Sequence, residues 1–259
     1  MEIEELNRAA WDRAAAAGNP HTQPVSPEQV AEARAGRFTI FFTDHKPVPA
    51  EWLGDLRNCR VLGLAAGGGQ QGPLLAAAGA TVTVLDISDE QLARDRFVAD
   101  RDGLNLRLVQ GRMDDLSAFG DGVFDLIVNP PSTLFVPDLA PIWRECHRVL
   151  RRGGHLVTAF ANPDEFVFDP DILDDTGQFV MRNRLPWAEA DALTPEQRRQ
   201  RILDGEMLHF SHSMEAQLGG LCVAGFVLTG FYEDRRSEAD GNPIRLYMPS
   251  GFVVRARRE

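Results

Sequence analysis

Apolar runs alternate with helical patterns between residues 59 and 161, and this order constrains the fold more than any other feature. Five runs read as successive strands: CRVLGLA (59–65), ATVTVLD (80–86), LRLVQG (106–111), FDLIVN (124–129) and GHLVTAFA (154–161). Nearly continuous hydrophobicity is typical of strands that are covered on both faces. Strands that alternate with helices indicate a parallel sheet between two helical layers. The sequence therefore predicts an α/β protein with a doubly wound, Rossmann-like sheet.

Two further strand patterns lie near the carboxyl end, GFVLTGFYED (225–234) and GFVVRARR (251–258). The connection between them contains Gly, Asn and Pro and is too short for a crossover helix. Strands joined without a crossover pair in antiparallel fashion. The prediction is a mostly parallel, seven-stranded sheet that ends in an antiparallel hairpin.

The helices between the strands carry clear signals. Ser88 and Gln91 form a capping-box pattern, and the helix that they open is expected to end at Gly103. A second helix, expected to end at Gly153 and Gly154, has apolar residues at helical spacing: Leu139, Ile142, Trp143, Cys146, Val149 and Leu150. Within it, Trp143 and Cys146 are interpreted as core residues.

Composition narrows the function classes. The 259 residues include 27 basic and 38 acidic side chains, for a formal net charge of −11, which does not favour binding to a nucleic acid backbone. Three widely spaced cysteines indicate neither a disulfide framework nor a zinc site. The amino terminus is acidic where a signal peptide is basic, and no long apolar run predicts a membrane span. A cytoplasmic protein is expected, and the sequence does not define its oligomeric state.

The stretch VLGLAAGGGQQG (61–72) follows the first predicted strand. Gly67, Gly69 and Gly72 satisfy the G-x-G-x-x-G pattern of dinucleotide sites, in which glycines let the backbone approach the ligand closely. The same stretch could equally hold an adenosine compound that has no phosphate. The motif alone leaves both alternatives open.

Five ordered pieces together resemble the class I S-adenosylmethionine-dependent methyltransferases, in particular small bacterial members of that family. The pieces are VLGLAAGGGQQG, VTVLDIS, VQGRMDDLSAFGDGVFDLIVNPPS, IWRECHRVLRRGGHLV and EAQLGGLCVAGFVLTGFYED. The resemblance covers roughly residues 55–161 and 210–256, and the antiparallel ending agrees with it. It implies S-adenosylmethionine as the cofactor.

Ligands of open parallel sheets bind beyond the carboxyl ends of the strands. On that basis and on the resemblance, the cofactor-binding residues are predicted to be Ala65, Gly67, Gly68, Gly69, Gln70, Asp86, Ile87, Gln91, Met113, Asp114, Asn129 and Pro130. Asp86 would accept hydrogen bonds from the ribose hydroxyls, or merely cap the following helix. Asp114, or its neighbour Asp115, would bind the adenine amine.

Two departures from the family pattern stand out. Gly63 and Ala65 occupy positions where the common form has an acidic residue and a glycine, which puts in doubt a contact with the methionine ammonium. After the fourth strand, Asn129, Pro130 and Pro131 match the hallmark of amino-group methyltransferases, but Ser132 replaces its aromatic residue. With the acidic charge, this replacement counts against a nucleic acid substrate.

The remaining segments divide the chain. We expect a helical cap at 1–54, a cofactor-binding core at 55–161 and 213–259, and an inserted lid at 162–212 with a short hairpin around Gly177. Such appended segments are where acceptor specificity normally lies. Because they would enclose a pocket, the predicted acceptor is a small molecule.

His209 and His212 lie close together near the end of the lid, followed by Glu215 and Gln217, but no metal-ligand spacing is matched and no metal is expected. His212 is predicted to be catalytic as a general base or to act as a substrate ligand, and a partly buried structural histidine is the alternative interpretation. Asn129 is predicted to face the transferred methyl group. Further expectations are that Ser213 caps its helix and that three residues line the acceptor pocket: Trp11, His21 and Phe135.

The function predicted is methyl transfer from S-adenosylmethionine to a small molecule. Four alternatives remain: release of methylthioadenosine from the same cofactor, amino-group methylation of a macromolecule, a nicotinamide oxidoreductase, and a cofactor-binding protein without turnover. Fold alone does not decide among them.

Overall fold

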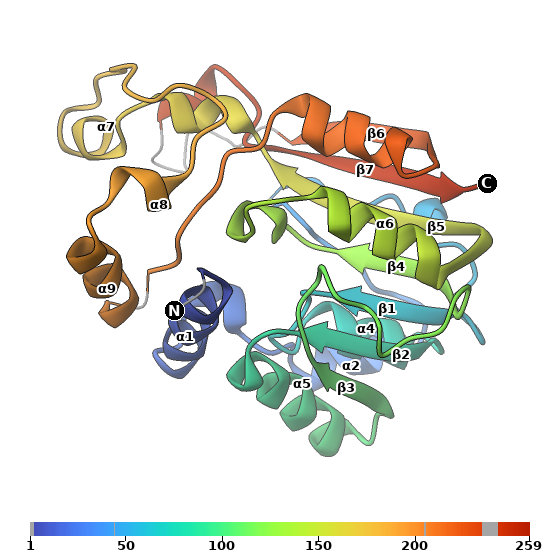
Figure 1. Cartoon of the computed structure of the whole chain (residues 1–259). Coiled ribbons are helices and arrows are strands. Elements are labelled where there is room, and N and C mark those ends of the chain that lie inside the picture. Colours follow the sequence, from blue (N-terminus) through green and yellow to red (C-terminus); the bar gives the residue numbers. More distant parts are fainter. Residues whose placement is uncertain (1–2, 44, 205, 235–242) are drawn as a thin grey trace.

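The computed structural model describes residues 3–43, 45–204, 206–234 and 243–259. Its centre is a single sheet in the order β3-β2-β1-β4-β5-β7-β6 (Figure 1). The strands are β1 (Arg60–Leu64), β2 (Thr81–Asp86), β3 (Leu106–Gln110), β4 (Phe124–Asn129), β5 (Leu150–Ala161), β6 (Phe226–Asp234) and β7 (Gly251–Arg258). Strands β1 to β5 pair in parallel, and β7 pairs antiparallel with both β5 and β6. The predicted seven-stranded sheet with an antiparallel ending is confirmed.

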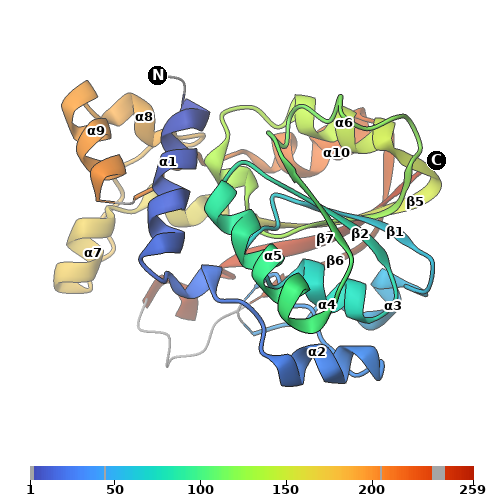
Figure 2. The ribbon, with the colours of Figure 1, turned by 90° about the horizontal axis from the view of Figure 1, so that it is seen from below.

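Helices cover both faces of the sheet and extend beyond its edge (Figure 2). The α-helices are α1 (Ile3–Ala16), α2 (Pro27–Arg34), α3 (Ala50–Leu53), α4 (Gln71–Ala77), α5 (Asp89–Asp102), α6 (Ala140–Val149), α7 (Pro170–Thr176), α8 (Glu189–Ala192), α9 (Pro195–Leu203) and α10 (Gly220–Val223). Shorter helical turns are η1 (Pro20–Thr22), η2 (Thr133–Phe135), η3 (Pro163–Val167), η4 (Glu215–Gly219) and η6 (Pro243–Leu246).

Two apolar cores lie on opposite faces of the sheet because neighbouring strand residues point to opposite sides. Val61 of β1 packs in a core with α2, α3, α4 and α5, whereas the adjacent Leu62 packs in a second core with α6 and α10. Trp143 and Cys146 of α6 are fully buried in this second core, as predicted.

The predicted ends of α5 are confirmed. The Ser88 side chain accepts a hydrogen bond from the Gln91 N–H, and Gly103 ends the helix in the left-handed region with φ 62°. Ser213 likewise accepts from the Ala216 N–H at the start of η4.

Two boundary predictions are wrong. Helix α6 ends at Val149, because Leu150 is already extended, and Gly153 and Gly154 lie within β5, where the pairing with β4 is irregular. Gly177 caps helix α7 with φ 68° instead of turning a hairpin. An isolated antiparallel bridge between Phe168 and Met181 does join the two ends of that segment.

The appended segments gather at the carboxyl ends of the parallel strands, where α1, α7, α8 and α9 lie (Figures 1 and 2). Helix α1 is fastened to α5: the Ser88 hydroxyl donates to Asp12 Oδ1 over 2.6 Å, and Arg94 donates to the Ala15 carbonyl over 2.8 Å. The amino-terminal segment therefore covers the sheet edge at which ligands of this fold bind.

Candidate functional site

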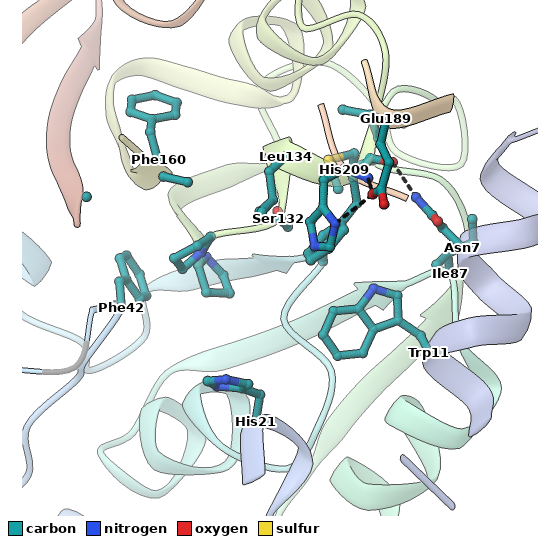
Figure 3. A pocket seen from close by; sticks show the side chains of 18 of the residues that line it. Asn7, Trp11, His21, Phe42, Ile87, Ser132, Leu134, Phe160, Glu189 and His209 are labelled. Atoms are coloured by element: carbon teal, nitrogen blue, oxygen red, sulfur yellow. Dashed lines mark hydrogen bonds and ion pairs between the residues drawn. The ribbon is translucent and has the colours of Figure 1, made fainter. Parts of the chain in front are cut away.

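A cavity of about 880 Å³ opens between the carboxyl ends of the strands and the appended segments. Figure 3 shows some of its lining side chains, from Phe42 and Phe160 on one side to Trp11 and His209 on the other. Nine predicted cofactor-binding residues line this cavity: Ala65, Gly67, Gln70, Asp86, Ile87, Gln91, Met113, Asp114 and Pro130. The sheet topology thus brings together residues that the sequence spreads over 66 positions (65 to 130).

Gly67 permits a close approach between the loop after β1 and the end of β2. Its N–H donates to Asp86 Oδ2 over 2.9 Å, and a Cβ added at Gly67 would lie 2.7 Å from Gln91 Cβ. Any side chain here would displace its neighbours and enter the space beside the Asp86 carboxylate. The position therefore requires glycine.

Gly68 and Gly69 lie behind the cavity wall and do not line it. Their φ values of 116° and 72° favour glycine, and the Gly68 N–H donates to Asp95 Oδ2 over 3.0 Å. Asp95 is fully buried on α5, and burial raises its pKa to about 8. Sequence reasoning missed this support for the loop, since nothing local marks Asp95 within an ordinary helical pattern.

The position of Asp86 is compatible with both roles that the sequence left open. Oδ1 accepts from the Ser88 N–H over 2.9 Å, which stabilises the start of α5, while the carboxylate also borders the cavity. Burial raises the pKa of Asp86 to about 6, against the hydrogen bonds from the backbone. Near neutral pH it is a charged hydrogen-bond acceptor at the cavity wall.

Gln91 leaves an acceptor for a ligand. The return half of the predicted capping box is not formed, and within the described part of the chain Gln91 Oε1 is buried without a hydrogen-bond partner. An unpaired buried acceptor costs about 1–3 kcal/mol, which a ligand donor would recover. The orphaned Oε1, the Asp86 carboxylate and the absence of a side chain at Gly67 fit an adenosyl cofactor with ribose hydroxyls.

The structure distinguishes between the two carboxylates that are candidates for binding adenine. Asp114 lines the cavity, while Asp115 is exposed and accepts from the Ser117 N–H. Asp114 forms a two-armed ion pair with Arg112, whose hydrogen bonds hold the pKa of the carboxyl below its usual range. Arg112 also contacts Glu4, which ties α1 to this wall.

Asn129 is not placed for catalysis. Fully buried and outside the cavity lining, it donates from Nδ2 to the Leu64 carbonyl and to Ser132 Oγ, both over 2.8 Å. Its Oδ1 accepts from the Thr158 hydroxyl over 2.9 Å. Because these bonds occupy the side chain, Asn129 orders the end of β4, and the prediction that it faces the transferred methyl group is not supported.

His212 is also set apart from the cavity. Its Nε2 lies 3.0 Å from the Thr133 carbonyl and 2.9 Å from the Val136 carbonyl. Since carbonyl oxygens only accept, Nε2 carries a proton there, and burial lowers the pKa of the ring. This geometry matches the structural interpretation of His212 and not that of a general base.

Of His209 and His212, it is His209 that borders the cavity, and its ring pairs with the buried Glu189. Sequence reasoning missed this pair because the two residues are twenty positions apart, with no local pattern linking them. Trp11, His21 and Phe135 line the cavity as expected.

Neither a cluster of metal ligands nor a membrane-spanning helix occurs among the described residues. No group of three or more His, Cys, Asp or Glu side chains there is arranged to hold a metal ion. Among the helices that the structure describes, none combines the length and the apolar character needed to cross a membrane.

Comparison with known proteins agrees with this architecture. Residues 62–158 match a family model described as "Methyltransferase domain". The "Uncharacterized methyltransferase YbaJ" of Bacillus subtilis is 44% identical over 229 residues, which cover 88% of this chain and 89% of that protein. A "Ubiquinone biosynthesis O-methyltransferase" of Cronobacter sakazakii is 32% identical over 155 residues, covering 55% of this chain and 64% of the relative.

The fold is shared with a solved S-adenosylmethionine-dependent methyltransferase from Mesorhizobium loti, with a TM-score of 0.63 at 21% identity, over 80% of this chain and 94% of that one. That likeness concerns the fold, whereas the long match to the Bacillus relative shows the family. The chain belongs to the S-adenosylmethionine-dependent methyltransferases.

Proposed function

We propose that the protein methylates a small, largely apolar molecule, which binds in the part of the cavity formed by the appended segments. The observation that carries the proposal is the set of aromatic side chains that both segments and the strand ends direct at one cavity: Trp11, Phe41, Phe42, Phe135, Phe160, Phe166, Phe168 and Trp187. The volume of about 880 Å³ lies within the range of small-molecule sites, roughly 300–1,000 Å³.

The proposed division of the cavity follows its chemistry. Asp86, Gln91 and Asp114 provide polar contacts for the cofactor at the strand ends, and Trp11 with Phe135 forms an apolar wall beyond them. S-adenosylmethionine supplies a methyl group already activated by its sulfonium. The protein's part is to orient the acceptor and exclude water, effects that together account for about 7–11 kcal/mol in well-oriented systems.

Two further facts support a small acceptor over a polymer. The net charge of −11 repels a nucleic acid backbone. The Cronobacter relative is named for methyl transfer to oxygen in ubiquinone biosynthesis, a small-molecule reaction.

The test is to incubate the protein with S-adenosylmethionine and a low-molecular-weight cell extract, with boiled protein as the control. S-adenosylhomocysteine, together with a mass gain of one methyl group in an extract component, is the expected result. Methylthioadenosine as the product would contradict methyl transfer. Incorporation of labelled methyl only into the macromolecular fraction of the same cells would contradict the small acceptor.

A pair of variants tests the location. Phe135 packs edge-on against Trp11 at 5.2 Å between ring centroids, so Phe135→Ala should raise the KM of the acceptor while sparing cofactor affinity. Phe97→Ala is the matched control, because Phe97 is exposed on α5 away from the cavity. Equal acceptor KM values for the two variants would contradict this location.

A further inference from the structure

The acceptor part of the cavity contains a paired histidine and carboxylate. Nδ1 of His209 lies 3.1 Å from Oε2 of Glu189. The Glu189 side chain is 6% exposed, whereas that of His209 is 36% exposed and borders the cavity. Figure 3 shows the His209 ring between Glu189 and the open space beside Trp11.

Backbone contacts hold the two residues together. The Glu189 N–H donates to the His209 carbonyl over 3.0 Å, and the His209 N–H donates to Glu189 Oε2 over 3.1 Å. On either side, the Leu208 N–H donates to Asn7 Oδ1 over 2.7 Å, and the Phe210 N–H donates to the Leu134 carbonyl over 2.8 Å. Helix α1, η2 and the lid therefore fix the backbone that carries the ring.

The charges around Glu189 keep it ionised. Burial opposes ionisation, but the hydrogen bond and charge of His209 and the charge of Arg201 outweigh it, and the pKa of Glu189 lies below its usual range. Arg201 Nε lies 3.1 Å from Glu189 Oε1. Because an ionised carboxylate only accepts hydrogen bonds, Nδ1 of His209 must carry a proton.

That tautomer leaves the lone pair of neutral His209 on Nε2. In the part of the chain that the structure describes, Nε2 of His209 makes no hydrogen bond. His212 differs in this respect, since its Nε2 proton is directed at two backbone carbonyls. Of the two histidines, only His209 presents a basic nitrogen at the cavity.

The surroundings of that nitrogen are aromatic. The His209 and Phe135 ring centroids are 5.4 Å apart, and Phe135 in turn packs against Trp11. A flat aromatic acceptor matches such a wall, because ring pairs prefer offset or edge-on packing.

We propose that His209, oriented by Glu189, is the general base of the methyl transfer, and that the acceptor is a planar aromatic molecule methylated at a hydroxyl or a ring N–H. This inference rests on the proposed function. In the step, His209 Nε2 takes the proton of the acceptor, and the electron pair freed on the acceptor atom forms the bond to the methyl carbon. The carbon–sulfur bond breaks with its electron pair remaining on sulfur, and His209 later returns the proton to water.

The first test needs no acceptor. NMR of isotope-labelled histidine, recorded on the full chain with bound S-adenosylhomocysteine, reports which ring nitrogen of His209 is protonated. The expected spectrum of neutral His209 shows protonated Nδ1, and Glu189→Gln should shift the population toward protonated Nε2. A neutral ring already protonated on Nε2 in the unsubstituted protein would overturn the proposal.

The second test uses para-nitrophenol as the probe, because its anion is coloured. We expect it to bind to the S-adenosylhomocysteine complex as the anion at a pH at which it is neutral in solution, and His209→Gln to abolish the colour change. His155→Gln is the matched control, since His155 lies on β5 outside the cavity lining. Absence of binding, or an unchanged signal in His209→Gln, would overturn the proposal.

Measuring turnover of the unsubstituted protein and of His209→Gln tests the proposed function and the role of His209 separately. With the low-molecular-weight extract, His209→Gln should lower kcat at least ~100-fold with the KM for S-adenosylmethionine unchanged, as loss of a general base does. Full turnover in that variant would overturn the role of His209 alone. No methylation of any small molecule by the unsubstituted protein would overturn the proposed function itself.

Discussion

The backbone N–H of Gly67 donates a 2.9 Å hydrogen bond to Asp86 Oδ2, and a Cβ built at Gly67 would lie 2.9 Å from that same oxygen. The loop after β1 and the end of β2 are thus in contact at the point where the cofactor ribose is expected. Gly67→Ala should therefore weaken S-adenosylhomocysteine binding more than tenfold, as measured by calorimetry. Gly120→Ala is the control, because its Cβ would meet Val123 at an ordinary 3.5 Å. Equal affinities of Gly67→Ala and Gly120→Ala for S-adenosylhomocysteine would show that the glycine loop does not contact the cofactor.

Asp86 should make cofactor affinity depend on pH. Its pKa is about 6, and hydroxyl donors of a ligand favour the charged form. Protonation on lowering the pH from about 7.5 to about 5 should therefore reduce affinity roughly tenfold, which corresponds to one pKa unit of binding free energy. Asp86→Asn should bind more weakly with a flat profile. A pH-dependent affinity that persists in Asp86→Asn would assign the titration to another group.

The sequence predicts those features that local patterns encode. Five apolar runs predict the parallel strands, and Ser88 predicts the start of α5, because side-chain burial and capping act within a few residues. The same patterns fail at Gly177, where a left-handed glycine suits a helix end as well as a turn. The sequence pattern around a glycine therefore does not distinguish a helix end from a hairpin turn.

The site is less predictable for a physical reason. Asp86 and Gln91 follow directly from their place at the end of β2 and the start of α5. His209 depends on Glu189, twenty positions away, and on Asn7, which bonds to the Leu208 backbone across 201 positions. Such contacts arise only when the appended segments pack on the core, so the choice between His209 and His212 required the structure.

Ala65 has a left-handed backbone with φ 47°, which is unfavourable for a residue with a Cβ. Ala65→Gly should relieve this and raise the free energy of unfolding by about 1 kcal/mol. Urea denaturation of Ala65→Gly and of Ala66→Gly provides the comparison. Ala66 is buried and has no positive φ, so its substitution should destabilise the fold. Loss of stability in both variants would show that the backbone at Ala65 is not strained.

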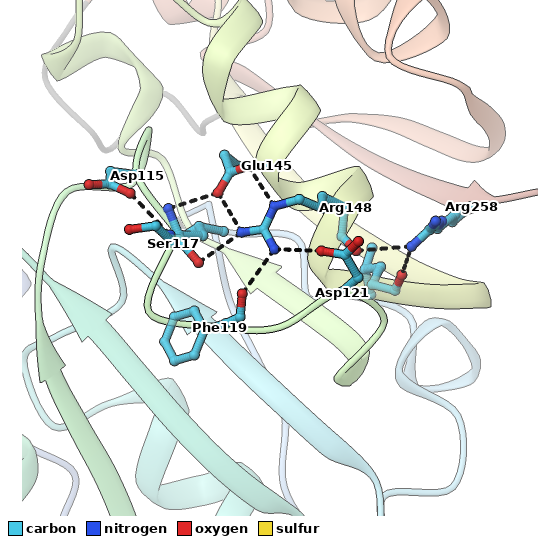
Figure 4. A network of polar contacts seen from close by, with 9 residues as sticks. Asp115, Ser117, Phe119, Asp121, Glu145, Arg148 and Arg258 are labelled. Atoms are coloured by element: carbon cyan, nitrogen blue, oxygen red, sulfur yellow. Dashed lines mark hydrogen bonds and ion pairs between the residues drawn. The ribbon is translucent and has the colours of Figure 1, made fainter.

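Arg148 ties the end of α6 to the loop before β4 (Figure 4). Its guanidinium donates to Glu145 and Asp121 and to the carbonyls of Leu116 and Phe119, over 2.7–2.9 Å. Arg148→Ala would leave Glu145 and the carbonyls without this partner, and we expect a loss of about 3 kcal/mol in the free energy of unfolding.

The control for that substitution is an exposed arginine. Arg152 is exposed on β5, so Arg152→Ala should change stability by less than about 0.5 kcal/mol. Thermal and urea unfolding of the two variants measure the difference. If Arg148→Ala were as stable as Arg152→Ala, the hydrogen bonds of Arg148 would make no net contribution to the free energy of unfolding.

Asp95 should make the stability of the fold depend on pH. Burial raises its pKa to about 8 in the folded protein, from an ordinary value of 3.8. The folded state therefore binds this proton more tightly than the unfolded state, and the associated stability is lost as the pH rises from about 4 through about 8. From about pH 6.5 to about pH 8, Asp86 is already ionised, and Asp95 should account for a loss of about 1.5 kcal/mol.

Asp95→Asn removes the titration while keeping an oxygen that can accept from the Gly68 N–H. The free energy of unfolding of this variant, measured in urea at both pH values, should change less than that of the unsubstituted protein, so that the two curves converge toward acid pH. Because the variant carries no charge at this buried position, its advantage should be largest above about pH 8, where the carboxylate of Asp95 is ionised. Parallel curves would mean that Asp95 is already ionised at pH 6.5 and that the glycine-loop N–H groups outweigh its burial.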